Sequence, residues 1–206
     1  MTLLFFGLFA FSLALSFVAT REVRDVATRR RWVSVPQDGR HVHETPLPRL
    51  GGAAIFFAFS VTLSLWLVLA LIFPRLVAGV VPTTLLRIYV PACLIFCLGI
   101  YDGLHGAGPY SKFAVQAVAA GMLFAGGMRV LDVPLIFRHT LPWFVGLPLT
   151  VLWVVAVTNA FNLIDGLDGL AAGSALFSTL VFFVVALVNH SWLCSLMSVT
   201  LAGSIG

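Results

Sequence analysis

The sequence predicts an all-α fold, a polytopic bundle of transmembrane helices with six complete spans and the start of a seventh. Of the 206 residues, 60% are hydrophobic and only 10% are charged, whereas soluble domains have about 45–50% apolar and about 25% charged residues. The apolar residues also form uncharged runs long enough to cross a bilayer, which takes about 20 residues in a helix. These proportions exclude a water-soluble enzyme, a disordered chain and a disulfide scaffold.

The predicted spans follow one another in a single transmembrane domain, residues 1–206. The first, residues 3–20, is uncharged and lacks the basic leading region and cleavage site of a signal peptide. The second, residues 50–73, begins at a glycine pair and ends before a proline. The third, residues 88–101, is expected to extend backwards past Arg87, because a long basic side chain reaches the interface. The later spans are predicted over residues 113–128, 148–162, 170–188 and, as an incomplete seventh, 191–206.

The charges of the loops predict the orientation of the chain. Eight of the twelve Lys and Arg residues fall on the side that holds loops 21–49, 102–112 and 163–169. Because Lys and Arg are enriched in cytoplasmic loops, this side is predicted to be cytoplasmic and the N-terminus to lie outside. The net charge of +4 is therefore assigned to loops beside the membrane and not to a nucleic-acid surface.

The first polar cluster lies at the end of the longest loop. Pro46 and Pro48 fix an extended path, and the glycine pair after them lets the backbone approach a ligand closely. His43 and Arg49 lie within this rigid frame, where an arginine suits phosphate oxygens. The alternative is a basic loop that binds anionic lipid headgroups, and it is favoured for the Arg-rich run that precedes the cluster.

The second polar cluster joins the third and fourth predicted spans. Asp102 comes directly after an apolar helix, and Lys112 follows before the next one. An ionisable residue at the edge of a span is costly to bury and is a candidate for function. The alternative is a solvated aspartate in a loop at the membrane edge.

The third polar cluster follows the fifth predicted span. If the segment is helical, Asn159, Asn162 and Asp165 recur every three residues and lie on one face. Asp168 adds a second carboxylate, and Gly166 allows a tight backbone beside a ligand. Two carboxylates and two amide oxygens suit Mg²⁺, or hydrogen bonds to a nucleoside.

In this order and spacing, the three clusters resemble the cytoplasmic loops of the polyprenyl-phosphate N-acetylhexosamine-1-phosphate transferases, the glycosyltransferase 4 family. This family includes phospho-N-acetylmuramoyl-pentapeptide transferase and undecaprenyl-phosphate GlcNAc-1-phosphate transferase. Its pattern HxxPxPRxGG matches residues 43–52, and NxxNxxDGLDGL matches residues 159–170. Its pattern GxxDDxxG…K matches residues 99–112, except that Gly103 replaces the second aspartate. Ser34 also replaces an aspartate that the family carries before a proline.

The resemblance implies an enzyme, a phosphoglycosyltransferase of the bacterial inner membrane whose active face is cytoplasmic. It would transfer a sugar-1-phosphate from a UDP-N-acetylamino sugar to polyprenyl (undecaprenyl) phosphate and release UMP, as a first membrane step of cell-wall or lipopolysaccharide synthesis. The implied cofactor is Mg²⁺. The implied partners are the UDP-amino sugar, polyprenyl phosphate and the membrane, without nucleic acid, and a homodimer stays open.

By the same resemblance, the cluster residues take three kinds of role. Asp102 would act on the lipid phosphate, as a base or as part of the metal shell. The implied sets are catalytic Asp102, Lys112 and His43; substrate-binding Arg49, Asn159, Asp165, Gly166 and Asp168; and the Mg²⁺ ligands Asn162 and Asp165.

Members of this family continue for several more helices, with a Gly-Asp motif and a histidine-rich cytoplasmic loop. The chain is therefore expected to be the N-terminal part of a longer transferase and to make no lipid-linked sugar by itself. Two alternatives stay open. One is a truncated or degenerate relative that binds nucleotide sugars or lipid phosphate without catalysis, which Gly103 would suit. The other, less favoured, is a transporter, which would carry its charges inside the spans and not at their ends.

Overall fold

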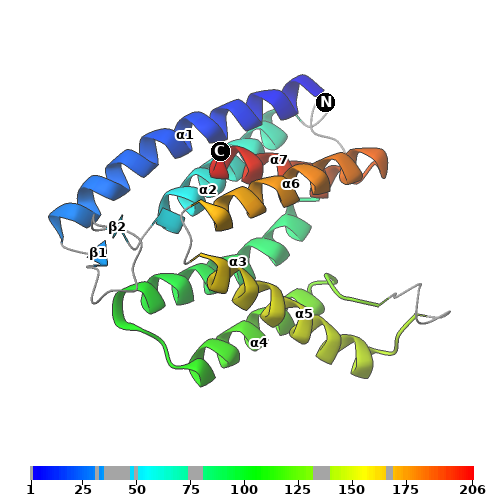
Figure 1. Ribbon diagram of the computed structural model, residues 1–206. Coiled ribbons are helices and arrows are strands. Elements are labelled where there is room, and N and C mark those ends of the chain that lie inside the picture. The colour runs from blue at the N-terminus through cyan, green and yellow to red at the C-terminus, as the bar shows by residue number, and fades with distance from the viewer. Residues whose placement is uncertain are drawn as a thin grey trace. The chain divides into compact units, whose positions relative to one another are not determined.

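The computed structural model describes residues 2–30, 33–34, 47–48, 51–73, 81–131, 140–165 and 169–206. Nearly all of this described part is helical, which confirms the predicted all-α class (Figure 1). The chain divides into two compact units, Met1–Val80 with Ala172–Gly206, and Val81–Ala171. The elements in chain order are α1 (Thr2–Arg29), β1 (Val33–Ser34), β2 (Leu47–Pro48), α2 (Gly51–Ile72), α3 (Pro82–His105), α4 (Pro109–Ala125), α5 (Trp143–Ile164), α6 (Leu170–Val188) and α7 (Trp192–Ile205).

Within the described residues, five helices are long and apolar enough to cross a membrane: α1, α2, α3, α5 and α6. The helices α4 and α7 have 17 and 14 residues and are not among these five. The predicted fourth span reached Met128, but α4 ends at Ala125. The cause is Gly127, whose φ of +94° ends the helix in a conformation that glycine adopts readily.

The surfaces of these helices are rich in large apolar side chains. Leu3, Leu163 and Val188 are 88%, 82% and 74% exposed. Such side chains are unfavourable in water and are accommodated by lipid, because lipid tails are themselves apolar. The exposed apolar surface and the helix lengths together identify a multi-pass membrane protein.

Several helix ends differ from those predicted. Helix α1 runs on to Arg29, so its 28 residues extend about 42 Å at 1.5 Å per residue, longer than the ~30 Å hydrocarbon core. The charged residues after position 20 therefore continue the helix beyond the apolar stretch. Helix α5 begins at Trp143 and contains Pro148 in its interior, as transmembrane helices tolerate. The extension of the third span past Arg87 is confirmed, because α3 begins at Pro82.

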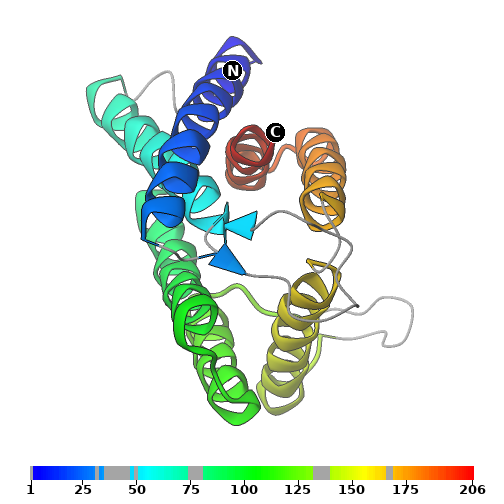
Figure 2. The ribbon, with the colours of Figure 1, turned by 60° about the vertical axis from the view of Figure 1, so that its left-hand side comes forward.

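In the first unit, α1 packs against α2 and α7, and Figure 2 shows α7 (red) beside α1 (blue). Two serines of α1 donate to main-chain carbonyls of α7. Ser12 Oγ lies 2.8 Å from the Thr200 oxygen, and Ser16 Oγ lies 2.6 Å from the Ser204 oxygen. The short strands β1 and β2 pair antiparallel, with Val33 opposite Pro48.

In the second unit, α4 packs against both α3 and α5. The start of α5 is tied to the chain that follows α4 by Thr150, whose Oγ1 accepts from the Val130 N–H at 3.0 Å and donates to the Gly146 oxygen at 2.7 Å. The start of α4 contacts the end of α5, so these two helices run antiparallel. The end of α3, the start of α4 and the end of α5 therefore lie at one end of the unit.

Candidate active site

An ion pair joins α3 to α4 at this end. Asp102 lies in the last turn of α3, and Lys112 lies in the first turn of α4. Asp102 Oδ2 is 2.7 Å from Lys112 Nζ, and Asp102 Oδ1 accepts from the Ala107 N–H at 2.8 Å. The side chains of Lys112 and Asp102 are 24% and 26% exposed. Each carboxylate oxygen thus has a defined partner, and the ammonium is held at a fixed place.

The predicted loop 102–112 is wrong in extent, because helix occupies most of it. Only residues 106–108 connect α3 to α4. Gly106 has a φ of +73°, and its N–H donates to the Asp102 main-chain oxygen at 2.9 Å, which ends α3. Pro109 then takes the first helical position of α4, where its missing N–H costs nothing. This short connection brings Asp102 and Lys112 together.

A second contact joins α4 to α5. Asn159 Nδ2 donates to Gln116 Oε1 at 3.0 Å and to the main-chain oxygen of Val155 at 2.8 Å. Gln116 is 4% exposed and lies one helical turn after Lys112. The amide pair satisfies two polar groups that would otherwise be costly in the interior.

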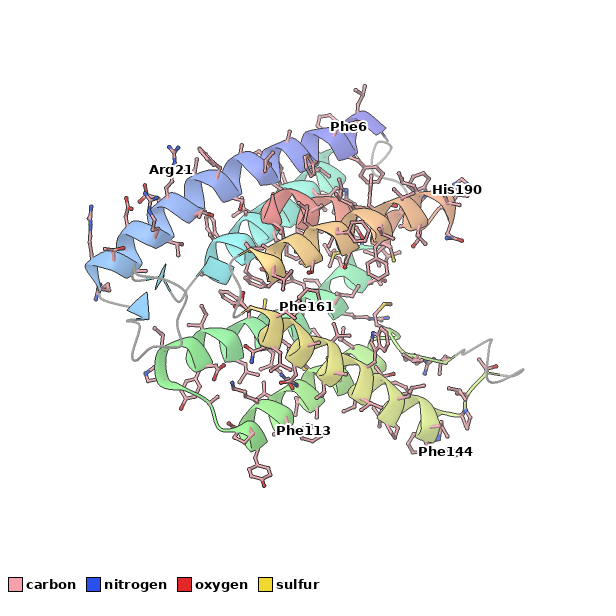
Figure 3. The ribbon with its side chains drawn as sticks, in the orientation of Figure 1. Phe6, Arg21, Phe113, Phe144, Phe161 and His190 are labelled. Atoms are coloured by element: carbon pink, nitrogen blue, oxygen red, sulfur yellow. The ribbon has the colours of Figure 1, made fainter. Side chains whose placement is uncertain are left out.

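A polar cavity of about 270 Å³ lies between the start of α4 and the end of α5. Its polar lining comes from Lys112, Gln116, Asn159 and Asn162. Figure 3 labels Phe113, which also lines the cavity, at the start of α4. The remaining lining residues are Ala107 and Pro109.

The structure therefore brings together several of the predicted site residues. Lys112, Asn159 and Asn162 line the cavity, and Asp102 adjoins it through Lys112. Asp165 is exposed at the end of α5, where its N–H donates to the Phe161 oxygen, and it is not among the lining residues. Four predicted site residues lie outside the described part of the chain: His43, Arg49, Gly166 and Asp168.

Gln116 is a site residue that the sequence analysis did not identify. The sequence did contain a feature that could have identified it, because Gln116 is the one polar side chain within the predicted fourth span, residues 113–128. It also follows Lys112 by four residues, which places both side chains on the same helix face. A lone amide in an apolar helix, in register with a charged residue, therefore indicated a contact to another polar group.

The polar groups that line the cavity are of two chemical kinds. Lys112 presents a cation and can donate to anions, whereas the side chains of Asn159 and Asn162 carry oxygen acceptors. Among the described residues there is no group of three or more His, Cys, Asp or Glu side chains that would hold a metal ion alone. Mg²⁺ does not need such a group, because proteins bind it with one or two carboxylates, waters and the phosphates of the substrate. The oxygen donors at the end of α5 fit that pattern.

Comparison with known proteins gives relatives over nearly the whole chain. A probable undecaprenyl-phosphate N-acetylglucosaminyl 1-phosphate transferase of Bacillus subtilis is 35% identical over 208 residues, covering 96% of this chain and 53% of the relative. A decaprenyl-phosphate N-acetylglucosaminephosphotransferase of Mycobacterium tuberculosis is 34% identical, covering 92% and 49%. An undecaprenyl-phosphate alpha-N-acetylglucosaminyl 1-phosphate transferase of Thermotoga maritima is 30% identical, covering 81% and 48%. The chain thus spans about half the length of these relatives.

The family match covers the part of the chain that carries the cavity. Residues 85–206, from α3 to α7, match the family described as glycosyl transferase family 4. This range includes Asp102, Lys112, Gln116 and Asn159. The match extends over more than half of the 206 residues, and the chain therefore belongs to glycosyl transferase family 4.

Proposed function

We propose that this chain contributes the site of an enzyme that transfers a sugar-1-phosphate from a UDP-N-acetylamino sugar to undecaprenyl or another polyprenyl phosphate, releasing UMP. The observation that carries the proposal is the cavity beside the Asp102–Lys112 pair, at the ends of α3 and α5, which are long and apolar enough to cross the membrane. One substrate is soluble and the other is anchored in the bilayer, so the reaction needs a polar site at such a boundary. The names of the relatives support the same acceptor. We place the reaction at the cytoplasmic face of the bacterial inner membrane, on the distribution of Lys and Arg.

The reaction is a phosphoryl transfer. A phosphate oxygen of the polyprenyl phosphate attacks the phosphorus that bears the sugar, and the P–O bond to UMP breaks with its electron pair leaving on UMP. The attacking phosphate needs no base at neutral pH, because the second pKa of a phosphate monoester is about 6. The protein must instead align the two phosphates and offset their charge.

Lys112 suits the task of binding these phosphates. Its ammonium has three donors, and one faces Asp102 Oδ2 at 2.7 Å. The others remain for phosphate oxygens. Asp102 has its two oxygens on Lys112 and Ala107, so we assign it the positioning of Lys112 in preference to proton transfer.

The cofactor that we propose is Mg²⁺. Asn162 and Asp165 lie three residues apart at the end of α5, a spacing that puts two oxygen donors on one side of a helix. When bound with the substrate, the ion offsets negative charge on the diphosphate. For the predicted residues outside the described part, we propose that His43 and Arg49 contact phosphates and that Gly166 and Asp168 contact the nucleotide.

The test is a transfer assay on membranes that carry the chain within its complete open reading frame. Radiolabelled UDP-N-acetylglucosamine and undecaprenyl phosphate are supplied with Mg²⁺, and labelled lipid and released UMP are measured. The expected result is equal amounts of labelled lipid and UMP. Both products should be lost with Lys112→Met. They should also be lost when a chelator is added to the wild type, and added Mg²⁺ should then restore them. Unchanged product with Lys112→Met would contradict the assigned role of the cavity.

A non-catalytic relative that only binds the substrates is the second candidate. The observation that favours it is Gly103, which stands beside Asp102 where the related pattern carries a second aspartate. This candidate predicts saturable binding of the nucleotide sugar in the same membranes, with no labelled lipid and no UMP.

A further inference from the structure

The hydrogen bonds of Asn159 fix the orientation of two side-chain amides. The main-chain oxygen of Val155 can only accept, so the Asn159 atom that lies 2.8 Å from it is the amide nitrogen. The same nitrogen lies 3.0 Å from Gln116, so Gln116 must present its oxygen there. The oxygen and nitrogen of a side-chain amide are nearly alike in shape, so hydrogen-bond partners must distinguish them. Here the Val155 carbonyl determines the orientation of both amides.

Both residues line the cavity. Their mutual hydrogen bond uses Gln116 Oε1 and Asn159 Nδ2, so it leaves the Nε2 donor of Gln116 and the Oδ1 acceptor of Asn159 for other partners. Gln116 stands one turn after Lys112 on α4, and Asn159 stands three residues before Asn162 on α5. Two donors, Lys112 Nζ and Gln116 Nε2, therefore come from α4, and the Asn159 Oδ1 acceptor comes from α5.

We propose that Gln116 is a positioning and specificity-determining residue, which keeps the phosphate-binding donors of α4 separate from the cation-binding oxygen of α5. Resting on the proposed function, the inference is that a phosphate oxygen of a nucleoside diphosphate binds Lys112 Nζ and Gln116 Nε2. The Oδ1 atom of Asn159 then points to the divalent cation or to its bound waters. Gln116 acts on the phosphate directly and on the cation through Asn159, because its Oε1 holds the Asn159 amide in place.

The competing interpretation gives Gln116 a packing role only. A buried amide needs a partner, and Asn159 supplies one. On that interpretation, a substitution that keeps the bond to Asn159 changes neither stability nor ligand affinity, and one that breaks the bond lowers both affinities together with stability. The two interpretations differ in whether nucleotide and cation affinities change separately.

The experiment compares Gln116→Glu and Asn159→Asp with the wild-type protein, expressed from the complete open reading frame and held in nanodiscs. Glutamate has nearly the volume of glutamine and still accepts from Asn159, but it lacks the donor and adds a negative charge beside Lys112. We expect the Kd for UDP to rise by about tenfold or more, as for the loss of a hydrogen bond to a charged group. Mn²⁺ affinity without nucleotide, measured by electron paramagnetic resonance, is expected to be retained or increased.

Asn159→Asp tests the second half of the inference. A carboxylate can donate neither to Gln116 nor to the Val155 oxygen. It is therefore expected to turn away from the Val155 carbonyl, while Gln116 turns its Nε2 toward the carboxylate and withdraws it from the phosphate. UDP affinity is then expected to fall while Mn²⁺ affinity rises. The matched control is Thr158→Val on the neighbouring position of α5, where Oγ1 donates to the Val154 oxygen of its own helix. Both affinities should stay within about twofold, since the substitution removes one hydrogen bond within the helix and no contact of the cavity.

Each outcome decides the question. Weaker UDP binding with Mn²⁺ affinity retained or increased supports the inference, because misfolding lowers both affinities. Wild-type affinities in both variants, or parallel losses that follow a lower melting temperature, overturn it and leave the proposed function standing if the wild type binds UDP. A wild-type protein that binds no UDP overturns the proposed function and this inference with it.

Discussion

Lys112 Nζ on α4 lies 2.7 Å from Asp102 Oδ2 on α3, across a connection of only three residues. The same carboxylate accepts from the Ala107 N–H within that connection. Asp102 therefore shapes the turn and holds the ammonium at the edge of the cavity. About a quarter of each side chain is exposed, and an ion pair in contact with solvent contributes only about 0.2–1 kcal/mol to stability. The pair is thus better suited to placing Lys112 than to stabilising the fold.

Asp102→Asn is expected to separate activity from stability. The asparagine oxygen still accepts from Ala107, but the charge that fixes Lys112 is lost. The free energy of unfolding should change by less than about 1 kcal/mol, whereas the transfer rate should fall by about tenfold or more because the phosphate is misaligned. Detergent unfolding and the labelled-lipid assay measure the two quantities.

The control for this variant is Ser111→Ala. Ser111 is exposed and its Oγ donates to the Gly108 oxygen, so the change disturbs the start of α4 without removing a group of the ion pair. It should retain most of the activity. If Asp102→Asn loses stability in proportion to activity, Asp102 is a structural residue and Lys112 does not depend on it for function.

For some of the polar residues in this unit, the sequence predicted that they lie together. The three-residue period of Asn159 and Asn162 indicated one helix face, and both side chains line the cavity. The order of the predicted spans put the clusters of Asp102 and Asn159 on one side of the membrane, and the second unit has both residues at the same end. These features follow from helical periodicity and from the order of the apolar runs, which are read directly along the chain.

The contact between Gln116 and Asn159 was not predictable in the same way. The two residues are 43 positions apart, and the register of α4 against α5 depends on how their apolar side chains interlock. Many interchangeable Ala, Val, Leu and Phe residues fill these helices, so several registers satisfy the same hydrophobic pattern. The extent of α3 was also missed, because Asp102 and His105 are polar residues that nevertheless continue the helix to Gly106.

Gly103→Asp is expected to raise the transfer rate in the complete protein. The substitution restores the adjacent aspartates of the related pattern, beside the residue that holds Lys112. Gly103→Asn is the matched control, since it has the same shape without the charge and should not raise the rate. Initial rates of labelled-lipid formation compare the two variants. An unchanged or lower rate with Gly103→Asp, or an equal gain with both variants, would show that a carboxylate at this position does not assist transfer.

Gly203→Ala is expected to weaken the packing of α1 against α7. A Cβ atom at this position would lie 2.5 Å from the Phe9 oxygen and 2.9 Å from Ser12 Cβ, so one helix must shift. Overpacking of this kind costs about 1–3 kcal/mol. Gly173→Ala on α6 is the control, because its added Cβ meets nothing within 4 Å and alanine favours helix by about 0.5–1 kcal/mol. Melting temperatures in detergent should move in opposite directions, and equal shifts would contradict the close approach at Gly203.

Thr150→Val is expected to lower stability without changing UDP affinity, whereas Asp102→Asn is expected to lower activity with little change in stability. Thr150 is buried, and its Oγ1 accepts from the Val130 N–H at the end of the second unit away from the cavity. Valine fills the same space but leaves that N–H without its partner, which costs about 1–3 kcal/mol. The cavity lies more than two helical turns away along α5, so UDP affinity measured below the unfolding transition should be unchanged. Thr158→Val serves as the control for stability, because its hydroxyl bonds only to its own helix. If Thr150→Val instead weakens UDP binding and leaves the melting temperature unchanged, the two ends of the unit are coupled. Thr150 would then affect ligand binding and not stability, which contradicts the prediction.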